Sequence, residues 1–227
     1  MTRKYEVKSR QTLETINGLM DKGIKKISVI LRHSDRFFSK EARLEPFMGL
    51  TQEGKSFALD LGKSLPKTPV PRLFSSMFGR CIETAYLIDK GYTQQHKISL
   101  DHTITHEMLA PFYIKDIKRA LPIMEDQGSE RFIRLWFDRK IDPGIIENPE
   151  TTALMLSRYM TDHLDQLKDN EIALCVSHDW NIFPLKEFKL GLAHETNGDV
   201  GYLDGVVFYE NQGQYFVTSG QAGPCPI

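Results

Sequence analysis

Three stretches of this chain combine residue types that bind anions and move protons. The first is Leu31-Arg32-His33-Ser34-Asp35-Arg36, in which two arginines four positions apart flank a histidine. Planar guanidinium groups bind phosphate or carboxylate through paired hydrogen bonds, and an imidazole that is largely neutral at about pH 7 can serve as nucleophile or base. A lone histidine between two arginines also fits a solvated surface salt bridge, so the hexapeptide gains meaning only if other stretches agree with it.

Two later stretches carry matching residues. Arg80 opens a helical pattern shortly after the apolar run 72–76, and His178 and Asp179 directly follow the apolar run 171–176. The hexapeptide likewise follows an apolar run, so each stretch comes after a predicted buried strand. Ligands of α/β sheets bind at the carboxyl ends of the strands. We therefore expect the three stretches to meet at one edge of a sheet.

The elements that must position these residues alternate between strand and helix. Apolar runs predict strands at 26–31, 72–76 and 171–176, a weak strand at 98–105, and a hairpin of 204–209 with 215–219, after which 220–227 is expected to fray. Helical spacing predicts helices that begin near Ser9 or Thr12, after the cap Thr51, at 80–89, and after the cap Asn148 with Pro149 in the first turn. This order predicts an α/β fold of three α/β/α layers with a mostly parallel central sheet.

The segment 107–148 has a different character. It is rich in aromatic residues, has two short helical patterns around 114–121 and 130–138, and contains the breakers Pro111, Pro122, Gly128 and Pro143. We predict a single domain over 1–227 with a small helical cap insertion at about 107–148, where insertions on a rigid scaffold contact the rest of a ligand. Phe132, Trp136 and Phe137 either stack on that ligand or pack the core of the cap, and packing is the favoured interpretation.

Composition restricts the class of protein. The chain has 227 residues, 41% hydrophobic and 26% charged, with a formal net charge of −1, so no broad field exists to hold nucleic acid or an anionic membrane. Cys81, Cys175 and Cys225 are odd in number and form no C-x-x-C pair, which argues against a disulfide framework or a zinc knuckle. The N-terminus has no apolar segment of the signal-peptide type, and no run of about 18 apolar residues occurs. We expect a cytoplasmic protein.

The three stretches resemble, in order and spacing, the motifs of the histidine phosphatase superfamily, the phosphoglycerate mutase-like proteins. Arg32-His33-Ser34-Asp35-Arg36 resembles the R-H-G-x-R signature, with Ser34 at the glycine position. Ser76 to Ala85, which includes Arg80, resembles the second phosphate-binding arginine segment, and Ser177-His178-Asp179 resembles the H-D motif of the acid-phosphatase branch. Gly49-Leu50-Thr51 and Gly54 resemble the L-T-x-x-G turn, so the likeness extends over roughly 24–210.

The resemblance implies a metal-independent phosphomonoesterase without cofactors. His33 would attack phosphorus and carry a phosphohistidine, while the phosphate oxygens would be held by Arg32, Arg36, Arg80 and His178. Asp179 would protonate the leaving oxygen and then activate water, which implies an acidic pH optimum. Glu107 is the alternative acid, because it stands where the mutase-like branch carries its glutamate.

Other interpretations stay open from the sequence. The likeness also fits a phosphoglycerate mutase-like phosphotransferase, or a phospholigand-binding module whose catalysis is impaired, for which Ser34 is the only hint. His102 and His106 have zinc-like i, i+4 spacing but lack the H-E-x-x-H pattern, so no metal is expected there. The expected partner is a small phosphorylated substrate, with neither nucleic acid nor membrane, and the sequence indicates no oligomeric state.

Overall fold

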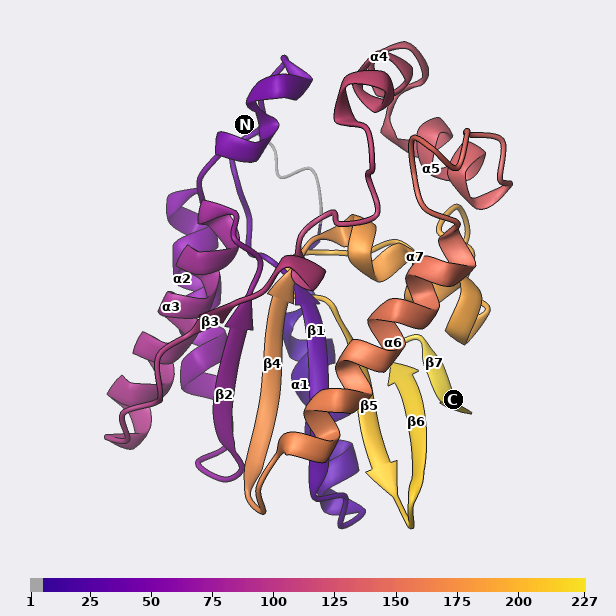
Figure 1. Ribbon diagram of the computed structural model, residues 1–227. Coiled ribbons are helices and arrows are strands. Elements are labelled where there is room, and N and C mark those ends of the chain that lie inside the picture. The colour runs from indigo at the N-terminus through magenta and orange to yellow at the C-terminus, as the bar shows by residue number, and fades with distance from the viewer. Residues whose placement is uncertain (1–5) are drawn as a thin grey trace.

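The computed structural model describes residues 6–227, apart from the side chain of Ala42. Residues 1–5, on which the expectation about a signal peptide partly rests, lie outside the described residues. A seven-stranded sheet with the strand order β3-β2-β4-β1-β5-β6-β7 forms the centre of the fold (Figure 1). The strands are β1 (Lys26–Arg32), β2 (Val70–Ser75), β3 (Ile104–Thr105), β4 (Glu171–Ser177), β5 (Gly205–Asn211), β6 (Gln214–Ser219) and β7 (Ala222–Pro226). The helices are α1 (Ser9–Asp21), α2 (Gln52–Ser64), α3 (Gly79–His96), α4 (Ile117–Gln127), α5 (Ser129–Phe137), α6 (Pro149–Gln166) and α7 (Asp179–Leu190), with short 3-10 helices η1 (Ala42–Phe47) and η2 (Glu107–Leu109).

The sheet is parallel in one half and antiparallel in the other. β3, β2, β4 and β1 run parallel, whereas β5, β6 and β7 are joined to β1 by antiparallel pairing. The α/β prediction is confirmed, but "mostly parallel" holds only for the core strands. The tail prediction for 220–227 is wrong, because β7 pairs with the free edge of β6 instead of fraying.

Helices cover both faces of the sheet, as the three-layer prediction requires. Alternate strand residues point to opposite faces, so Ile27, Val29 and Leu31 of β1 pack on the side of α1, α2 and α3. Ile30 faces the other way, toward α6 and α7, and the two resulting cores lie on opposite faces of the sheet. The sheet is therefore buried on both faces, and its strand ends are the places where polar side chains can emerge.

Local sequence explains where the main helices begin. The Thr51 side chain accepts a hydrogen bond from Gly54 N, which caps α2, and Asn148 Oδ1 accepts from Glu150 N and Thr151 N, which caps α6. α1 was expected to begin near Ser9 or Thr12 as a cap; it begins at Ser9, but Ser9 is the first helical residue and no side chain caps it. The 98–105 strand prediction is largely wrong, since only Ile104 and Thr105 pair.

The segment 107–148 forms η2, α4 and α5 above the carboxyl ends of the parallel strands (Figure 1). Phe132, Trp136 and Phe137 are buried in the same core as Ile30 of the sheet, which favours packing over stacking on a ligand. Pro122 was predicted to break a helix but lies inside α4, where it removes one backbone hydrogen bond without ending the helix. Among residues 6–227, no helix is both long and apolar enough to cross a membrane.

Candidate active site

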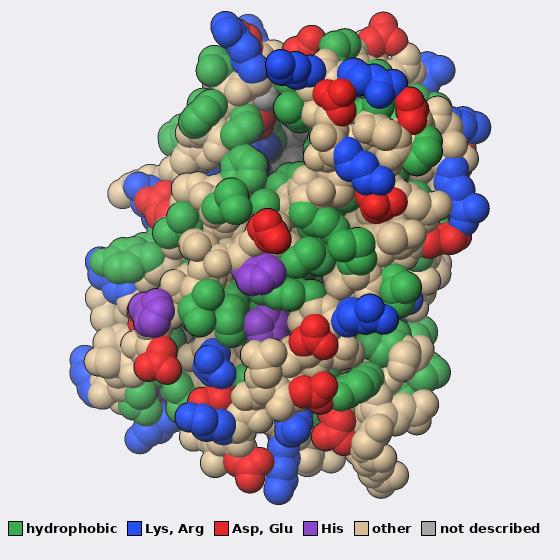
Figure 2. Space-filling model, in the orientation of Figure 1, with side chains coloured by type: hydrophobic (Ala, Val, Ile, Leu, Met, Phe, Trp, Pro, Cys, Tyr) green, Lys and Arg blue, Asp and Glu red, His purple; other side chains and the backbone are tan. Residues whose placement is uncertain are grey.

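The predicted motifs converge at the carboxyl ends of β1, β4 and β2. His33 N donates to Ser177 O at 2.9 Å, and Ser76 N donates to Val176 O at 2.9 Å, so the residues after the three strands are tied together by backbone hydrogen bonds. η1 on one side and α4 on the other stand above these ends (Figure 1). The space-filling view shows both lobes from the same side, with hydrophobic and charged side chains exposed on them (Figure 2).

His33 is held as a neutral imidazole with one nitrogen turned toward a guanidinium. Its Nδ1 lies 2.8 Å from Ser34 O, and because a carbonyl only accepts, Nδ1 carries the proton. Its Nε2 therefore has the lone pair and accepts from Arg80 Nε at 3.1 Å. Burial, with Arg80 and Arg32 nearby, holds the pKa of His33 well below its usual value. The nitrogen that faces Arg80 is thus an unprotonated potential nucleophile.

His178 has the opposite tautomer. Its Nδ1 accepts from Arg80 Nη2 at 3.1 Å, so Nε2 carries the proton and donates to Ser76 Oγ at 3.0 Å. Burial and then Arg80 lower the pKa of His178 well below its usual value. The two imidazole rings meet edge to face, with centroids 5.6 Å apart. Arg80 thereby contacts both rings at once.

The η1 segment contacts two of the predicted phosphate-binding arginines. Arg80 Nη1 donates to the backbone oxygens of Glu45 and Pro46, at 3.1 Å and 3.3 Å. Arg36 forms an ion pair with the carboxylate of Glu45 rather than with either histidine. Arg36 still lowers the pKa of His178 through its charge, which places it in the same electrostatic environment. A phosphate in this site would meet Arg80 directly and would compete with Glu45 for Arg36.

Arg32 and Asp179 form a pair at the inner side of the site. Arg32 Nη2 lies 2.7 Å from Asp179 Oδ2, and only 1% of the Arg32 side chain is exposed. Arg32 Nη1 also donates to Val200 O at 2.6 Å, and its guanidinium carbon lies 4.5 Å from the centre of the Tyr202 ring. The predicted proton donor is therefore the ion-pair partner of a predicted phosphate ligand.

Ser34 fits the glycine position without backbone strain. Its φ angle is not positive, whereas five other non-glycine residues of the described chain do have positive φ. Ser34 Oγ donates to Gly54 O at 2.7 Å, and Ser34 N donates to Thr84 Oγ1 at 3.1 Å. A Cβ at Gly54 would lie 2.0 Å from Asp35 O, so the turn that resembles L-T-x-x-G packs its glycine directly against the loop that carries His33.

Glu107 lies at the same strand ends but at their outer side. Its neighbour His106 donates its backbone N–H to Ser75 O at 2.9 Å, and the Asn181 side chain donates to Met108 O at 3.2 Å. The Glu107 side chain is exposed, and within the described chain no ion pair is formed by it. These contacts fix the backbone around Glu107 beside the site, while its carboxyl group is exposed.

Several site residues were not predicted from the sequence. Val200 and Tyr202 contact Arg32 from a loop without any periodic signal, and Glu45 contacts Arg36 from the short 3-10 helix η1. Ser76 lay inside the segment that resembles the arginine motif, and its position directly after a buried strand is a signal that could have marked it. His102 and His106 do not belong to any cluster of possible metal ligands within the described residues.

One such cluster does exist within residues 6–227, formed by Glu187, His194 and Glu195. The guanidinium of Arg134 bonds to both of these carboxylates. The two carboxylates of the cluster are thus already engaged in an ion-pair network with Arg134, and none of the predicted site residues belongs to it.

Comparison with known proteins places this geometry among solved structures. No family model matches the chain, and no curated protein matches it with significant similarity. Solved structures do match over most of their length. A mycobacterial glucosyl-3-phosphoglycerate phosphatase aligns with a TM-score of 0.57 at 16% identity, over 87% of this chain and 100% of its own.

Two bacterial proteins align similarly. Phosphoglycerate mutase from Bacillus anthracis aligns with a TM-score of 0.50 at 19% identity, over 88% of this chain and 96% of its own. Bacillus stearothermophilus YhfR aligns with a TM-score of 0.52 at 19% identity, over 87% of this chain and 98% of its own. The chain therefore has the fold of these phosphatase and phosphoglycerate mutase structures, in agreement with the family that its motifs resemble.

Proposed function

We propose that this protein is a metal-independent phosphomonoesterase that works through a phosphohistidine at His33. The observation that carries the proposal is the tautomer of His33. Its Nδ1–H is fixed by Ser34 O, and its unprotonated Nε2 faces the Arg80 guanidinium. A buried neutral imidazole aimed at a permanent cation suits attack on a dianion that the cation holds in place.

The proposed reaction has two displacements. His33 Nε2 attacks phosphorus in line, a P–N bond forms, and the bond from phosphorus to the leaving oxygen breaks. The leaving oxygen takes a proton from a carboxylic acid. Water then attacks the phosphohistidine and gives a proton to the same carboxylate, while the P–N bond breaks and inorganic phosphate leaves. Charge on the equatorial oxygens is balanced by Arg32, Arg36 and Arg80, without a metal, and the neutral His178 ring supports the site through its contact with Arg80.

The acid must be free to approach the leaving oxygen, and the contacts of the two candidates differ. The Asp179 carboxylate is paired with Arg32 at 2.7 Å, and this contact holds the Arg32 guanidinium in place. Glu107 is exposed and has no cationic partner among the described side chains. We therefore propose Glu107 as the proton donor and Asp179 as the residue that orients Arg32, which reverses the order of preference taken from the sequence.

Leaving-group chemistry tests this assignment. Glu107→Gln should slow hydrolysis of an alkyl phosphate far more than that of p-nitrophenyl phosphate, whose leaving group needs little protonation. Asp179→Asn should slow both substrates by similar factors, because it disturbs Arg32. The reverse pattern would return the acid role to Asp179.

The enzyme proposal itself is tested on the chelator-treated protein. Hydrolysis of p-nitrophenyl phosphate between about pH 4 and 8 is expected, together with trapping of phosphate on His33 in an alkaline denaturing quench, because the P–N bond of a phosphohistidine hydrolyses in acid. Binding of phosphate or vanadate without turnover would instead indicate a phospholigand-binding module. Phosphoryl transfer to a second hydroxyl compound in preference to water would indicate a phosphotransferase of the mutase-like kind.

Substrate class and setting follow from the same features. The similar structures include a phosphatase of a phosphorylated sugar acid and a mutase of phosphoglycerate, so we propose a small phosphorylated metabolite as the substrate. The helices α4 and α5 of the 107–148 cap lie above the carboxyl ends of the parallel strands (Figure 1) and would contact the part of the substrate beyond the phosphate. Cys81 and Cys175 are buried free thiols, which fits the reducing cytoplasm that we propose as the compartment.

A further inference from the structure

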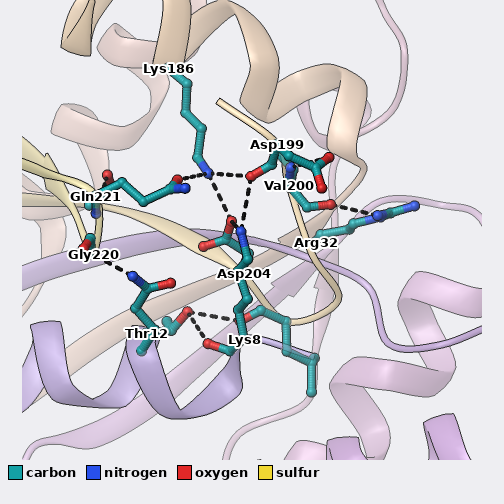
Figure 3. A network of polar contacts seen from close by, with 12 residues as sticks. Lys8, Thr12, Arg32, Lys186, Asp199, Val200, Asp204, Gly220 and Gln221 are labelled. Atoms are coloured by element: carbon teal, nitrogen blue, oxygen red, sulfur yellow. Dashed lines mark hydrogen bonds and ion pairs between the residues drawn. The ribbon is translucent and has the colours of Figure 1, made fainter. Parts of the chain in front are cut away.

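A completely buried lysine lies behind the site. Lys186 of α7 is 0% exposed, and its ammonium donates to three oxygens: Asp204 Oδ2 at 2.8 Å, Asp199 O at 3.0 Å and Gln221 Oε1 at 2.7 Å (Figure 3). All three N–H bonds of the ammonium are thus used. Two of the acceptors are the first and last residues of the loop 199–204, so one side chain fastens both ends of that loop.

The loop 199–204 contacts both the backbone and the side chain of Arg32. Arg32 N donates to Asp204 O at 2.9 Å, and Leu203 N donates to Arg32 O at 3.2 Å. The guanidinium donates to Val200 O and lies against the Tyr202 ring. Figure 3 shows Val200 between Asp199 and the Arg32 guanidinium. The orientation of the Arg32 guanidinium therefore depends on the conformation of this loop.

The loop shape is one that the chain does not adopt freely. Leu203 has φ of 57°, in the left-handed region that costs a residue with a branched side chain about 1 kcal/mol or more. Its carbonyl is fixed by Thr12 Oγ1 at 2.8 Å, and Tyr202 is bonded through its backbone to Glu6 and Lys8. Such a conformation persists only where surrounding contacts impose it, and the Lys186 ammonium supplies two of these contacts.

The same helix reaches Arg32 from its other end. α7 begins at Asp179, which pairs with Arg32, and Lys186 lies seven residues further along, roughly 10 Å away along the helix axis at 1.5 Å per residue. One rigid helix thus holds the guanidinium directly through Asp179 and indirectly through Lys186 and the loop. Asp204 is 3% exposed, so without the Lys186 ammonium its buried carboxylate would keep only the more distant ammonium of Lys8, at 3.9 Å.

We propose that Lys186 is a positioning residue for the phosphate site, acting through the loop 199–204 on Arg32. The inference rests on the proposed function, because only the proposed function gives Arg32 a phosphate to bind. Lys186 does not touch the substrate. Its ammonium keeps Val200 O and the Tyr202 ring in the places that set the Arg32 fork, so that Arg32 meets the phosphate already oriented.

A double-mutant cycle on phosphate binding tests the inference. Lys186→Met should weaken binding of inorganic phosphate, measured by calorimetry with vanadate as a competitor, at least tenfold in the otherwise unsubstituted protein. In an Arg32→Ala background the same change should cost less than twofold, because the group through which Lys186 acts is already gone. Tyr92→Phe is the matched control: it removes a hydrogen bond to Lys67 O from a fully buried side chain. It should lower the melting temperature without weakening phosphate binding.

The outcomes separate the two proposals. An equal loss from Lys186→Met in both backgrounds, or a change in melting temperature alone, would overturn the role of Lys186. Phosphate binding without hydrolysis would overturn only the phosphatase. No phosphate binding by the unsubstituted protein would overturn both. If Lys186→Met does not fold, Asp204→Asn keeps the shape and weakens the same ion pair, and its smaller loss should likewise disappear in the Arg32→Ala background.

Discussion

Buried histidines lie against the same sheet in two contrasting surroundings, the pair His33 and His178 in one and His163 in the other. His33 and His178 lie at the strand ends, and each of their ring nitrogens has a hydrogen-bond partner. His163 lies on α6, with its ring 4.2 Å from that of Phe74 and 4.7 Å from that of Tyr159, measured between centroids. Its Nε2 is buried and has no hydrogen-bond partner among the described residues.

The contrast shows that burial by itself does not mark a site. Desolvation is the largest cause of the lowered pKa in all three histidines, so all three are held neutral. Only the strand-end pair has a cation bonded to its lone pairs, and this is what prepares a ring to meet an anion. His163 is surrounded by aromatic rings and contributes to the packing of the core. The partners of a histidine, rather than its exposure, therefore predict its role.

The largest expected effect comes from removing the ring of His33. His33→Ala should lower kcat for p-nitrophenyl phosphate on the order of a thousandfold or more, because the nucleophile is lost. His163→Leu also replaces a histidine, but one that lies in the core. It should keep kcat within about threefold, since it removes no contact of the site. Steady-state kinetics on both variants checks this. Comparable losses in the two variants would erase the functional distinction between the groups.

The second prediction concerns acid stability. Burial lowers the pKa of His163 to about 4, so the unfolded chain takes up a proton at a higher pH than the folded protein. A group of this kind leaves stability intact above about pH 6.5 and subtracts from it as the pH falls toward the folded pKa. At about pH 4 the loss amounts to about 3 kcal/mol at most.

Urea unfolding of His163→Leu at several pH values measures this contribution. The fall in unfolding free energy from about pH 7 to pH 4 should be smaller in the variant by about 3 kcal/mol or less. Tyr159→Phe is the control, because its hydroxyl lies in the same aromatic cluster and does not titrate at acidic pH. An unchanged pH slope in His163→Leu would show that His163 is not held neutral by the fold.

The third prediction removes the cation that distinguishes the two groups. Arg80→Ala deletes the hydrogen-bond partner of both His33 Nε2 and His178 Nδ1, so phosphate binding should weaken by about 1 to 3 kcal/mol. Because Arg80 also lowers the pKa of His33, the acidic limb of kcat/KM should move to higher pH. Arg72→Ala is the matched control, since Arg72 lies near Phe74 beside His163. Normal phosphate affinity in Arg80→Ala would detach Arg80 from the site.

Local signals were sufficient for the part of the fold that positions the site. The strands at β1, β2 and β4 follow from apolar runs, and the caps Thr51 and Asn148 lie where the sequence predicts them. The failures are long-range. β7 forms because β6 offers an edge, and residues 98–103 do not pair because Ile98 and Leu100 pack against the helical core instead. Neither outcome is encoded within a window of a few residues.

The residues of the site likewise fall into those that local sequence signals predict and those that only long-range contacts bring in. His33, Arg80 and His178 could be brought together from the sequence because each follows a strand and parallel strands end at one edge. The partners that set their chemistry could not, since Tyr202 reaches Arg32 from 170 positions further along the chain through a loop with no periodicity. The pairing of Asp179 with Arg32 is likewise a tertiary contact, and it alters which carboxyl group is proposed as the acid.

The smallest effect is expected from a change that removes the hydrogen-bond acceptor of His178 Nε2, so that this nitrogen resembles the unpartnered Nε2 of His163. Ser76→Ala removes the acceptor of the Nε2–H of His178, leaving Cys81 Sγ at 3.6 Å as a weak substitute. A buried donor without a partner costs about 1 kcal/mol or more, and the freed ring can turn away from Arg80. Phosphate binding should therefore weaken by about fivefold, the equivalent of about 1 kcal/mol.

A second buried serine provides the control for this prediction. Ser28 Oγ donates to Met160 O at 2.7 Å, on the α6 side of the sheet where His163 lies. Ser28→Ala should lower stability by a similar amount and leave phosphate affinity unchanged, because no site histidine depends on it. If Ser28→Ala weakened phosphate binding as much as Ser76→Ala, general loosening of the sheet would explain both losses. If only Ser76→Ala does so, the orientation of His178 depends on its hydroxyl partner, and the difference between the two histidine groups lies in the partners of their rings.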